Sequence, residues 1–224
     1  MTGAGQAILL ALLDIHPEAE DDFNEWYNRE HMRDRVVGLP GFRRGRRFVS
    51  SGVNPRYAAL YEAESAETFT SEAYLSLIRD PDENSRRYLP NFIGTTRFMG
   101  RLLASVGEGE GAAAGFYLFD AIDGQTDALR RWLTDAVPGF AAQRGVVAAH
   151  AWEMAPDLVA ASKRVHLRQT PDRVQGFVVL VEGAQADGIR SVDRALMGVE
   201  GITGHGGAAP LIAGPYQMVY RVSP

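Results

Sequence analysis

The sequence predicts an α+β fold in which two tandem ferredoxin-like units pack sheet to sheet as an α/β-barrel. Two observations lead to this fold class. Each half of the 224-residue chain shows the element order β-α-β-β-α-β, which defines the ferredoxin-like unit. The tripeptide Pro-Gly-Phe occurs at residues 40–42 and again at 138–140, an offset of 98 residues (138 − 40), each time after a helical pattern. We interpret this repeat as an internal duplication of two fused units.

Composition restricts the classes of function. The chain has no cysteine, which excludes disulfides, thiolate metal sites and cysteine nucleophiles. The formal net charge is −5 and the charges are interspersed, so nucleic acid is not an expected partner. The apolar run at residues 7–13 is too short to span a bilayer and has no charged segment before it. We therefore expect a cytoplasmic protein with no membrane partner.

The first unit is predicted over residues 5–106. A continuous apolar run at residues 7–15 indicates a strand that is buried on both faces. Residues 18–37 then carry apolar side chains at helical spacing, with acids in the first turns and bases in the last, and Gly38 and Pro40 end this helix. The unit is completed by strands at 42–51 and 57–64, a helix at 66–79, an irregular polar segment at 80–90 and a strand at 96–106.

The second unit is predicted over residues 116–223, after a glycine-rich linker at residues 107–115. Its first helix is expected to end before Pro138, so that the second Pro-Gly-Phe is a turn that leads into a strand. The other expected elements are strands at 116–122, from the turn to residue 154, at 175–182 and at 216–222, and helices at 126–136 and 187–197.

The sheets of the two units are expected to cover each other. Alternate residues of the strand at 146–154, including His150 and Trp152, place mostly apolar side chains on one face. An apolar face of that area requires a cover, and the matching sheet of the other unit supplies it. Two sheets stacked in this way enclose a space where a small ligand would bind.

The first helix and the turn after it resemble a known family. The pattern Phe-x-x-Trp-Tyr-x-x-Glu-His, here at residues 23–31, followed by Pro-Gly-Phe at 40–42, is similar to EthD-like members of the dimeric α/β-barrel superfamily, and the resemblance covers residues 5–106. Related folds include cofactor-free monooxygenases, polyketide cyclases, isomerases, dehydratases, haem enzymes and proteins without known activity, so the resemblance implies a fold more than a reaction. In relatives two chains form the barrel. A tandem chain can form it internally. Whether the whole chain also forms a homodimer is left open by the sequence.

His31 is the principal catalytic candidate. Its expected place at a helix C-terminus and its neighbour Glu30 both favour a protonated imidazole, and a histidine that titrates near neutrality suits general acid or base catalysis. The resemblance implies the same role, because a histidine at this position takes part in proton transfer in the isomerase branch. The alternative is a histidine that caps the helix. Glu30 is expected either to orient His31 or to pair with Arg33 or Arg35.

Further candidates surround this histidine in the sequence. Arg46 is expected on one strand face with Phe42 and Arg44. A buried arginine needs a negatively charged partner. This partner would be either an oxyanion or carboxylate of the substrate, or a carboxylate of the chain itself. His150 is also a candidate acid, base or haem ligand. Packing or solvent exposure is the alternative reading for all of the predicted substrate-binding residues, which are Trp26, Tyr27, Arg35, Tyr57, Tyr61, His150 and Trp152.

The second unit lacks a matching set of polar residues. Its first helix contains Trp132 but no histidine, and counting back from Pro138 places Leu129 at the position of His31. We therefore predict one site per chain, built chiefly by the first unit.

The favoured function is a cofactor-independent enzyme that acts on a small aromatic or polyketide-like substrate by acid–base proton transfer, as a cyclase, dehydratase, isomerase or lyase. The alternatives are a cofactor-free monooxygenase, a haem-dependent enzyme with His150 or His166 as ligand, and a non-catalytic binding or stress protein. The sequence contains no recognisable metal motif, nucleophile elbow, P-loop or dinucleotide fingerprint.

Overall fold

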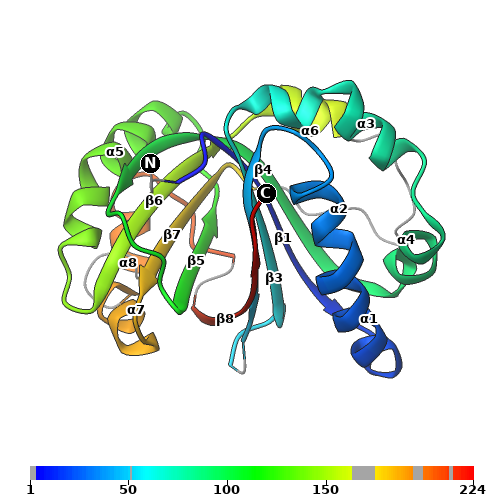
Figure 1. Cartoon of the computed structure of the whole chain (residues 1–224). Helices are drawn as coiled ribbons and strands as arrows, with labels where there is room; N and C mark the ends of the chain where they lie inside the picture. Colours follow the sequence, from blue (N-terminus) through cyan, green and yellow to red (C-terminus); the bar gives the residue numbers. More distant parts are fainter. Residues whose placement is uncertain (1–3, 51, 163–174, 194–198, 212–213) are drawn as a thin grey trace.

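The computed structural model describes residues 4–50, 52–162, 175–193, 199–211 and 214–224. Within these ranges, two ferredoxin-like units share one closed antiparallel barrel, whose strand order is β1-β3-β2-β8-β5-β7-β6-β4. The helices of the two units lie on opposite sides of the barrel, except that the helix at Pro156–Ser162 of the second unit lies beside those of the first (Figure 1). The predicted fold class is confirmed.

The first unit begins with β1 (Ala7–Ile15) and a helical segment in four parts that leads to β2. Its elements are, in order, a 3-10 turn (Pro17–Ala19), α1 (Glu20–Trp26), a π-helical turn (Tyr27–His31), α2 (Met32–Val36), β2 (Phe42–Val49), β3 (Tyr57–Ala63), a 3-10 helix (Ala66–Thr70), α3 (Glu72–Arg79), α4 (Glu83–Tyr88), a 3-10 turn (Leu89–Asn91) and β4 (Phe92–Val106).

The second unit repeats this order and has an additional helix between its second and third strands. Its elements are β5 (Ala113–Phe119), α5 (Thr126–Ala141), β6 (Val146–Met154), α6 (Pro156–Ser162), β7 (Phe177–Gly183), α7 (Ala186–Val192), α8 (Val199–Thr203) and β8 (Pro215–Val222). β5 begins inside the stretch expected to be a linker.

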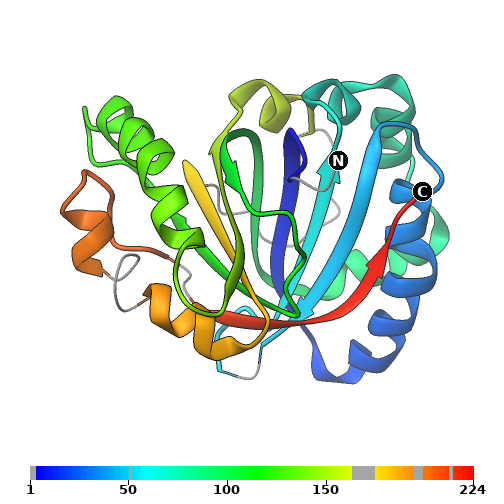
Figure 2. The ribbon, with the colours of Figure 1, turned by 60° about the vertical axis from the view of Figure 1, so that its left-hand side comes forward.

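The edge strands of each unit pair with those of the other. Each unit has the strand order fourth-first-third-second, which is β4-β1-β3-β2 in the first unit and β8-β5-β7-β6 in the second. β2 pairs antiparallel with β8 (Figure 2), and β4 pairs antiparallel with β6. The two sheets therefore face each other and are also joined along both edges, which leaves no open edge in the barrel.

Along each strand, successive side chains point alternately into the barrel and toward its outer, helix-bearing side. Ile8, Leu10 and Leu12 of β1 belong to one buried cluster with inward residues of the other strands, such as Phe116 and Trp152. The intervening residues of β1, Leu9, Ala11 and Leu13, pack with the helices of the first unit. This division explains why both faces of β1 are apolar.

The second Pro-Gly-Phe is not a turn, contrary to the sequence-based prediction. Pro138, Gly139 and Phe140 lie within α5, where Phe140 is fully buried against the barrel. The residue that matches Gly41 is Gly145, since both precede the second strand of their unit with φ of +86°. Only glycine adopts this backbone conformation without steric cost. The duplication is therefore visible in the topology, but the tripeptide does not mark equivalent positions.

Two further local predictions were wrong. The segment at 80–90, expected to be irregular, contains α4, because the side chain of Asp82 accepts a hydrogen bond from the Ser85 backbone N–H at 2.7 Å and caps the helix. Phe42 does not share a face with Arg44. A register shift between these residues turns Phe42 toward the helices, where it packs on Phe69.

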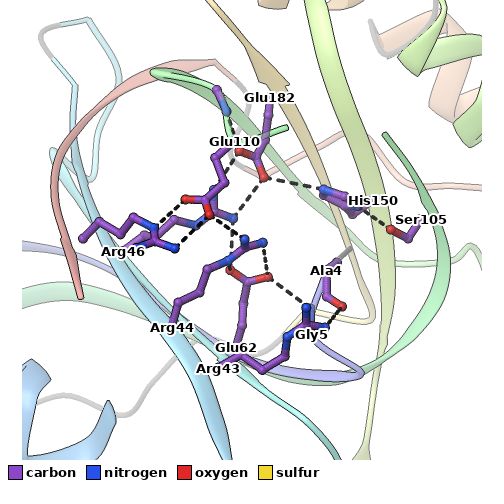
Figure 3. A network of polar contacts seen from close by, with 12 residues as sticks. Ala4, Gly5, Arg43, Arg44, Arg46, Glu62, Ser105, Glu110, His150 and Glu182 are labelled. Carbon is purple, nitrogen blue, oxygen red and sulfur yellow. Dashed lines mark hydrogen bonds and ion pairs between the residues drawn. The ribbon is translucent and has the colours of Figure 1, made fainter. Parts of the chain in front are cut away.

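A network of buried ion pairs occupies one end of the barrel (Figure 3). Arg46 binds Glu182 at 2.7 and 3.0 Å and Glu62 at 3.1 Å. Arg44 binds Glu62 at 2.9 Å and Glu110 at 2.7 Å. Because Arg46 belongs to the first unit and Glu182 to the second, the network links the two units. None of the described helices is long and apolar enough to cross a membrane.

Replacing Arg46 by Met should lower the free energy of unfolding by about 3–5 kcal/mol, because Glu182 and Glu62 would keep buried charges without this partner. Urea denaturation followed by circular dichroism measures this change. Arg101 is the matched control, since it pairs with Asp157 on the surface. Arg101→Met should lower the free energy of unfolding by less than about 1 kcal/mol. Equal losses in the two variants would contradict a structural role of the buried network.

Acid should weaken the same network. Burial alone would raise the pKa of Glu182, but the hydrogen bond with His150 and the charge of Arg46 outweigh burial and lower this pKa from 4.5 to about 2. A carboxyl group with a depressed pKa stabilises the folded state above its unfolded-state value. This contribution should be complete above pH 4.5 and be lost as the pH falls toward 2. In Glu182→Gln, the stability deficit relative to wild type should therefore shrink over that interval. A deficit independent of pH would contradict this assignment.

Candidate functional site

The candidate site is built on a π-helical turn between α1 and α2. Tyr27–His31 forms this turn, and the helix continues as α2 to Val36. π-helical turns are rare and occur frequently at functional sites. The turn directs Trp26, Tyr27 and His31 together toward the barrel wall, and all three side chains are buried.

His31 lies among aromatic rings. Its ring centroid is 4.4 Å from that of Trp26 and 4.6 Å from that of Tyr27. Trp26 in turn stacks on Tyr88 of α4 at 4.9 Å. The side chain of His31 is buried, at 7 % exposure. Planar, apolar rings on one side of an imidazole form a surface suited to an aromatic ligand.

The expected position of His31 at a helix C-terminus was wrong. Five more helical residues follow it, so the helix dipole does not act strongly on this side chain. Glu30 is exposed and accepts a hydrogen bond from Asn84 at 2.7 Å, which places its carboxylate on the solvent side of the helix. Arg35 lies closer, and its Nη1 donates to the carbonyl oxygen of His31 at 2.6 Å.

Arg47 reaches the same group of residues from β2. Its Nη1 donates to Asn28 Oδ1 at 2.7 Å and its Nη2 donates to Asn24 Oδ1 at 2.8 Å. The guanidinium carbon lies 4.5 Å from the ring centroid of Tyr27 and 5.1 Å from that of Phe23. Burial lowers the pKa of Arg47 below its usual value of 12.5. Tyr27 therefore contacts His31 and Arg47.

Two tyrosines of β3 contribute phenol groups. Tyr61 donates a hydrogen bond to the hydroxyl of Tyr27 at 3.2 Å, and burial raises the pKa of Tyr61 well above 10, which keeps it a neutral donor. Tyr57 accepts from Asn24 at 3.2 Å and donates to Glu20, and burial raises its pKa as well. We call this set the helix-side cluster and define it as Trp26, Tyr27, His31, Arg47, Tyr57 and Tyr61.

The other predicted site residues lie on the opposite face of the sheet, inside the barrel. Arg46 is neutralised there by Glu62 and Glu182. His150 has its Nδ1 2.9 Å from Ser105 Oγ and its Nε2 3.5 Å from Glu182, and Trp152 Nε1 donates to the Gly5 carbonyl at 3.2 Å. The barrel wall thus separates Arg46, His150 and Trp152 from His31.

Haem or metal ligation finds little support in the described part of the chain. Both ring nitrogens of His150 already have partners, so this residue does not fit a haem ligand, and His166 lies outside the described residues. The described residues contain no group of three or more histidine, aspartate and glutamate side chains that could hold a metal ion.

Arg47, Asn24 and Asn28 were not predicted as site residues. The alternation of β2 contained the signal, because an inward Arg46 requires Arg47 to face the helix. Asn24 and Asn28 are four residues apart, which places them on one helix face toward Arg47.

The second unit has no histidine at the matching positions. β5 begins 106 residues after β1 (113 − 7), and Gly145 follows Gly41 by 104 residues (145 − 41), so these two offsets place the match of His31 at Val137 or Asp135 of α5. The predicted match of His31 with Leu129 was therefore wrong, although the expected lack of a histidine holds. The buried side of α5 consists of Leu129, Leu133, Val137 and Phe140.

Comparisons with known proteins identify the fold. No family model matches the chain. No curated protein matches it either. Among solved structures, an anthrone oxidase-like protein matches with a TM-score of 0.64 and 12 % identity, over 100 % of this chain and 94 % of that one.

Two further solved structures match along most of their length. A candidate monooxygenase from Fusobacterium nucleatum subsp. nucleatum gives a TM-score of 0.62 at 9 % identity, over 98 % of this chain and 95 % of that one. Another, from Lactobacillus acidophilus, gives 0.61 at 6 % identity, over 97 % and 95 %. These similarities support the ferredoxin-like α+β-barrel fold over the whole chain. Membership of the EthD-like family stays a prediction.

Proposed function

We propose that this protein is an enzyme that works without an added cofactor and deprotonates a small aromatic or polyketide-like substrate, with His31 as the general base. The observation that carries the proposal is the burial of His31 between Trp26 and Tyr27 on a π-helical turn. Histidine is the side chain that most often serves as a general base, and the adjacent rings can bind a planar substrate.

The helix-side cluster also suits the charge that deprotonation creates. Removal of a proton next to a carbonyl group leaves an enolate, whose negative charge is stabilised by fixed hydrogen-bond donors and cations. Tyr61 stays a neutral phenol because burial raises its pKa, and Arg47 contributes a fixed positive charge across the ring of Tyr27. Return of the proton from His31 to another substrate atom would complete an isomerisation, a cyclisation or a dehydration.

A cofactor-free oxygenase is the second candidate. The similarity to an anthrone oxidase-like protein and to candidate monooxygenases favours it, although at this identity the similarity establishes the fold alone. The first step would be the same deprotonation at His31. The carbanion would then react with dioxygen, so that a methylene group and one O2 yield a carbonyl group and one water. Oxygen uptake therefore separates the two candidates.

A homodimer, which the sequence left open, is not needed to complete the barrel, because the two units of one chain close it.

A non-catalytic binding protein would use the same helix-side cluster without turnover. Absorption in the Soret region of the purified protein would identify the haem alternative.

His31→Ala should lower kcat by about 10²–10⁴-fold, the usual contribution of a general base. The assay follows anthrone and related aromatic ketones by absorbance and oxygen uptake, with no flavin or metal added. Circular dichroism should show an unchanged fold. Glu30→Gln is the matched control, because Glu30 is adjacent in sequence but faces solvent, and it should keep turnover.

Two outcomes bear on this proposal directly. Product formation without oxygen uptake supports proton transfer alone, whereas uptake of one O2 per product supports the oxygenase. Full turnover by His31→Ala would show that the base has been misassigned.

A further inference from the structure

We infer that the helix-side cluster binds its ligand as an aromatic oxyanion, such as a phenolate or an arene carboxylate, and that Arg47 supplies the opposite charge. The aromatic part of this inference rests on the proposed function. The charge of the ligand follows from Arg47 itself.

Arg47 is a buried cation whose described partners are all neutral. Its side chain is 2 % exposed. Its contacts are the side-chain amides of Asn24 and Asn28, the backbone carbonyl of Asn24 at 3.4 Å, and three aromatic rings. Proteins normally pair a buried charge with an opposite one, because its desolvation costs several kcal/mol. Within the described residues, Arg47 makes no ion pair.

The neighbouring arginines show what this chain does elsewhere. Arg44 and Arg46, on the same strand, are buried to a similar degree and both bind glutamates. Their pKa values are raised by these partners against the effect of burial, whereas burial lowers the pKa of Arg47. Glu20, which accepts a hydrogen bond from Tyr57, already pairs with Arg56 at 2.6 Å.

The guanidinium group has donors left for a ligand. An arginine carries five N–H groups. Three hydrogen bonds of Arg47 are made within the described residues, two from Nη1 and one from Nη2, and they leave two N–H groups for another acceptor. Carboxylate and phenolate oxygens are the acceptors that guanidinium groups bind most strongly.

The arrangement also connects the charge to the proposed chemistry. The ring of Tyr27 lies against both His31 and Arg47. A ligand beside Tyr27 can therefore present an acidic proton to His31 and an oxyanion to Arg47. Burial of a ligand anion against Arg47 would pair the charge that the chain leaves unpaired.

Equilibrium binding of 4-nitrophenol tests this inference without any turnover. Its absorbance distinguishes phenol from phenolate, so a pH titration of the wild-type complex gives the pKa of the bound ligand. We expect this pKa to be lower than that of free 4-nitrophenol. The neutral analogue 4-nitroanisole should bind at least about tenfold more weakly, since hydrogen bonds to charged groups contribute about 1.5–3 kcal/mol.

Three variants test which residue strengthens phenolate binding and lowers the pKa of the bound phenol. Arg47→Met should weaken phenolate binding by about tenfold or more. Arg56→Met is the matched control, because it removes the same charge from the exposed side of Tyr57 and should leave binding unchanged. His31→Ala should keep the lowered pKa of the bound phenol even if it abolishes turnover, which separates this inference from the proposed function.

The inference is overturned if wild type binds neither compound, or if the pKa of bound 4-nitrophenol is not lowered. It is also overturned if Arg47→Met binds phenolate as tightly as wild type, or if the lowered pKa disappears in His31→Ala but not in Arg47→Met. Should Arg47→Met fail to fold, the wild-type titration and the comparison with 4-nitroanisole still decide the question.

Discussion

The pairing of β2 with β8 and of β4 with β6 is the constraint on which the rest of the molecule depends. Once both seams are closed, every strand has one face inside the barrel and the other face toward the helices or, in β8, partly toward solvent. Charged side chains on the inner face then have no access to bulk water and require opposite charges from the chain. Glu62 and Glu182 meet this requirement for Arg44 and Arg46 of β2.

Closure also explains why neighbouring arginines of one strand have different surroundings. The alternation of β2 directs Arg46 into the barrel and Arg47 toward α1. Arg46 is held by two carboxylates from different units and serves the stability of the seam. Arg47 is held by asparagines and aromatic rings, next to the π-helical turn at Tyr27–His31. One strand thus carries an arginine paired with carboxylates on its inner face and an arginine with neutral partners on its outer face.

Much of the fold could be predicted from the sequence, because it depends on patterns that extend over whole elements. The apolar faces of β1, the element order of each half and the inward face of β6 are patterns of this kind. Features set by single contacts could not be predicted. The first Pro-Gly-Phe forms a turn after α2, whereas the second is part of α5. Phe140 is buried there, on the same side of the helix as Leu133 and Val137.

The same distinction between whole-element patterns and single contacts applies to the candidate site. The helix with Trp26, Tyr27 and His31 was identifiable from its composition, and the prediction that a buried arginine needs a carboxylate held for Arg46. The helix predicted over residues 18–37 already extended beyond His31, so the dipole effect assigned to this residue was overestimated. The π-helical turn leaves no signature in the apolar periodicity, and the orientation of Glu30 was not predicted. The sequence alone also could not show which face of β2 the helix covers.

Tandem fusion of the two units has a consequence for how such a barrel can change. A barrel made by two identical chains must carry every substitution twice, once in each half. Here α5 has no histidine to match His31 of the first unit, so the halves have diverged while both seams have been kept. Covalent joining releases the molecule from strict two-fold symmetry, which lets one half become a scaffold while the other retains its polar groups.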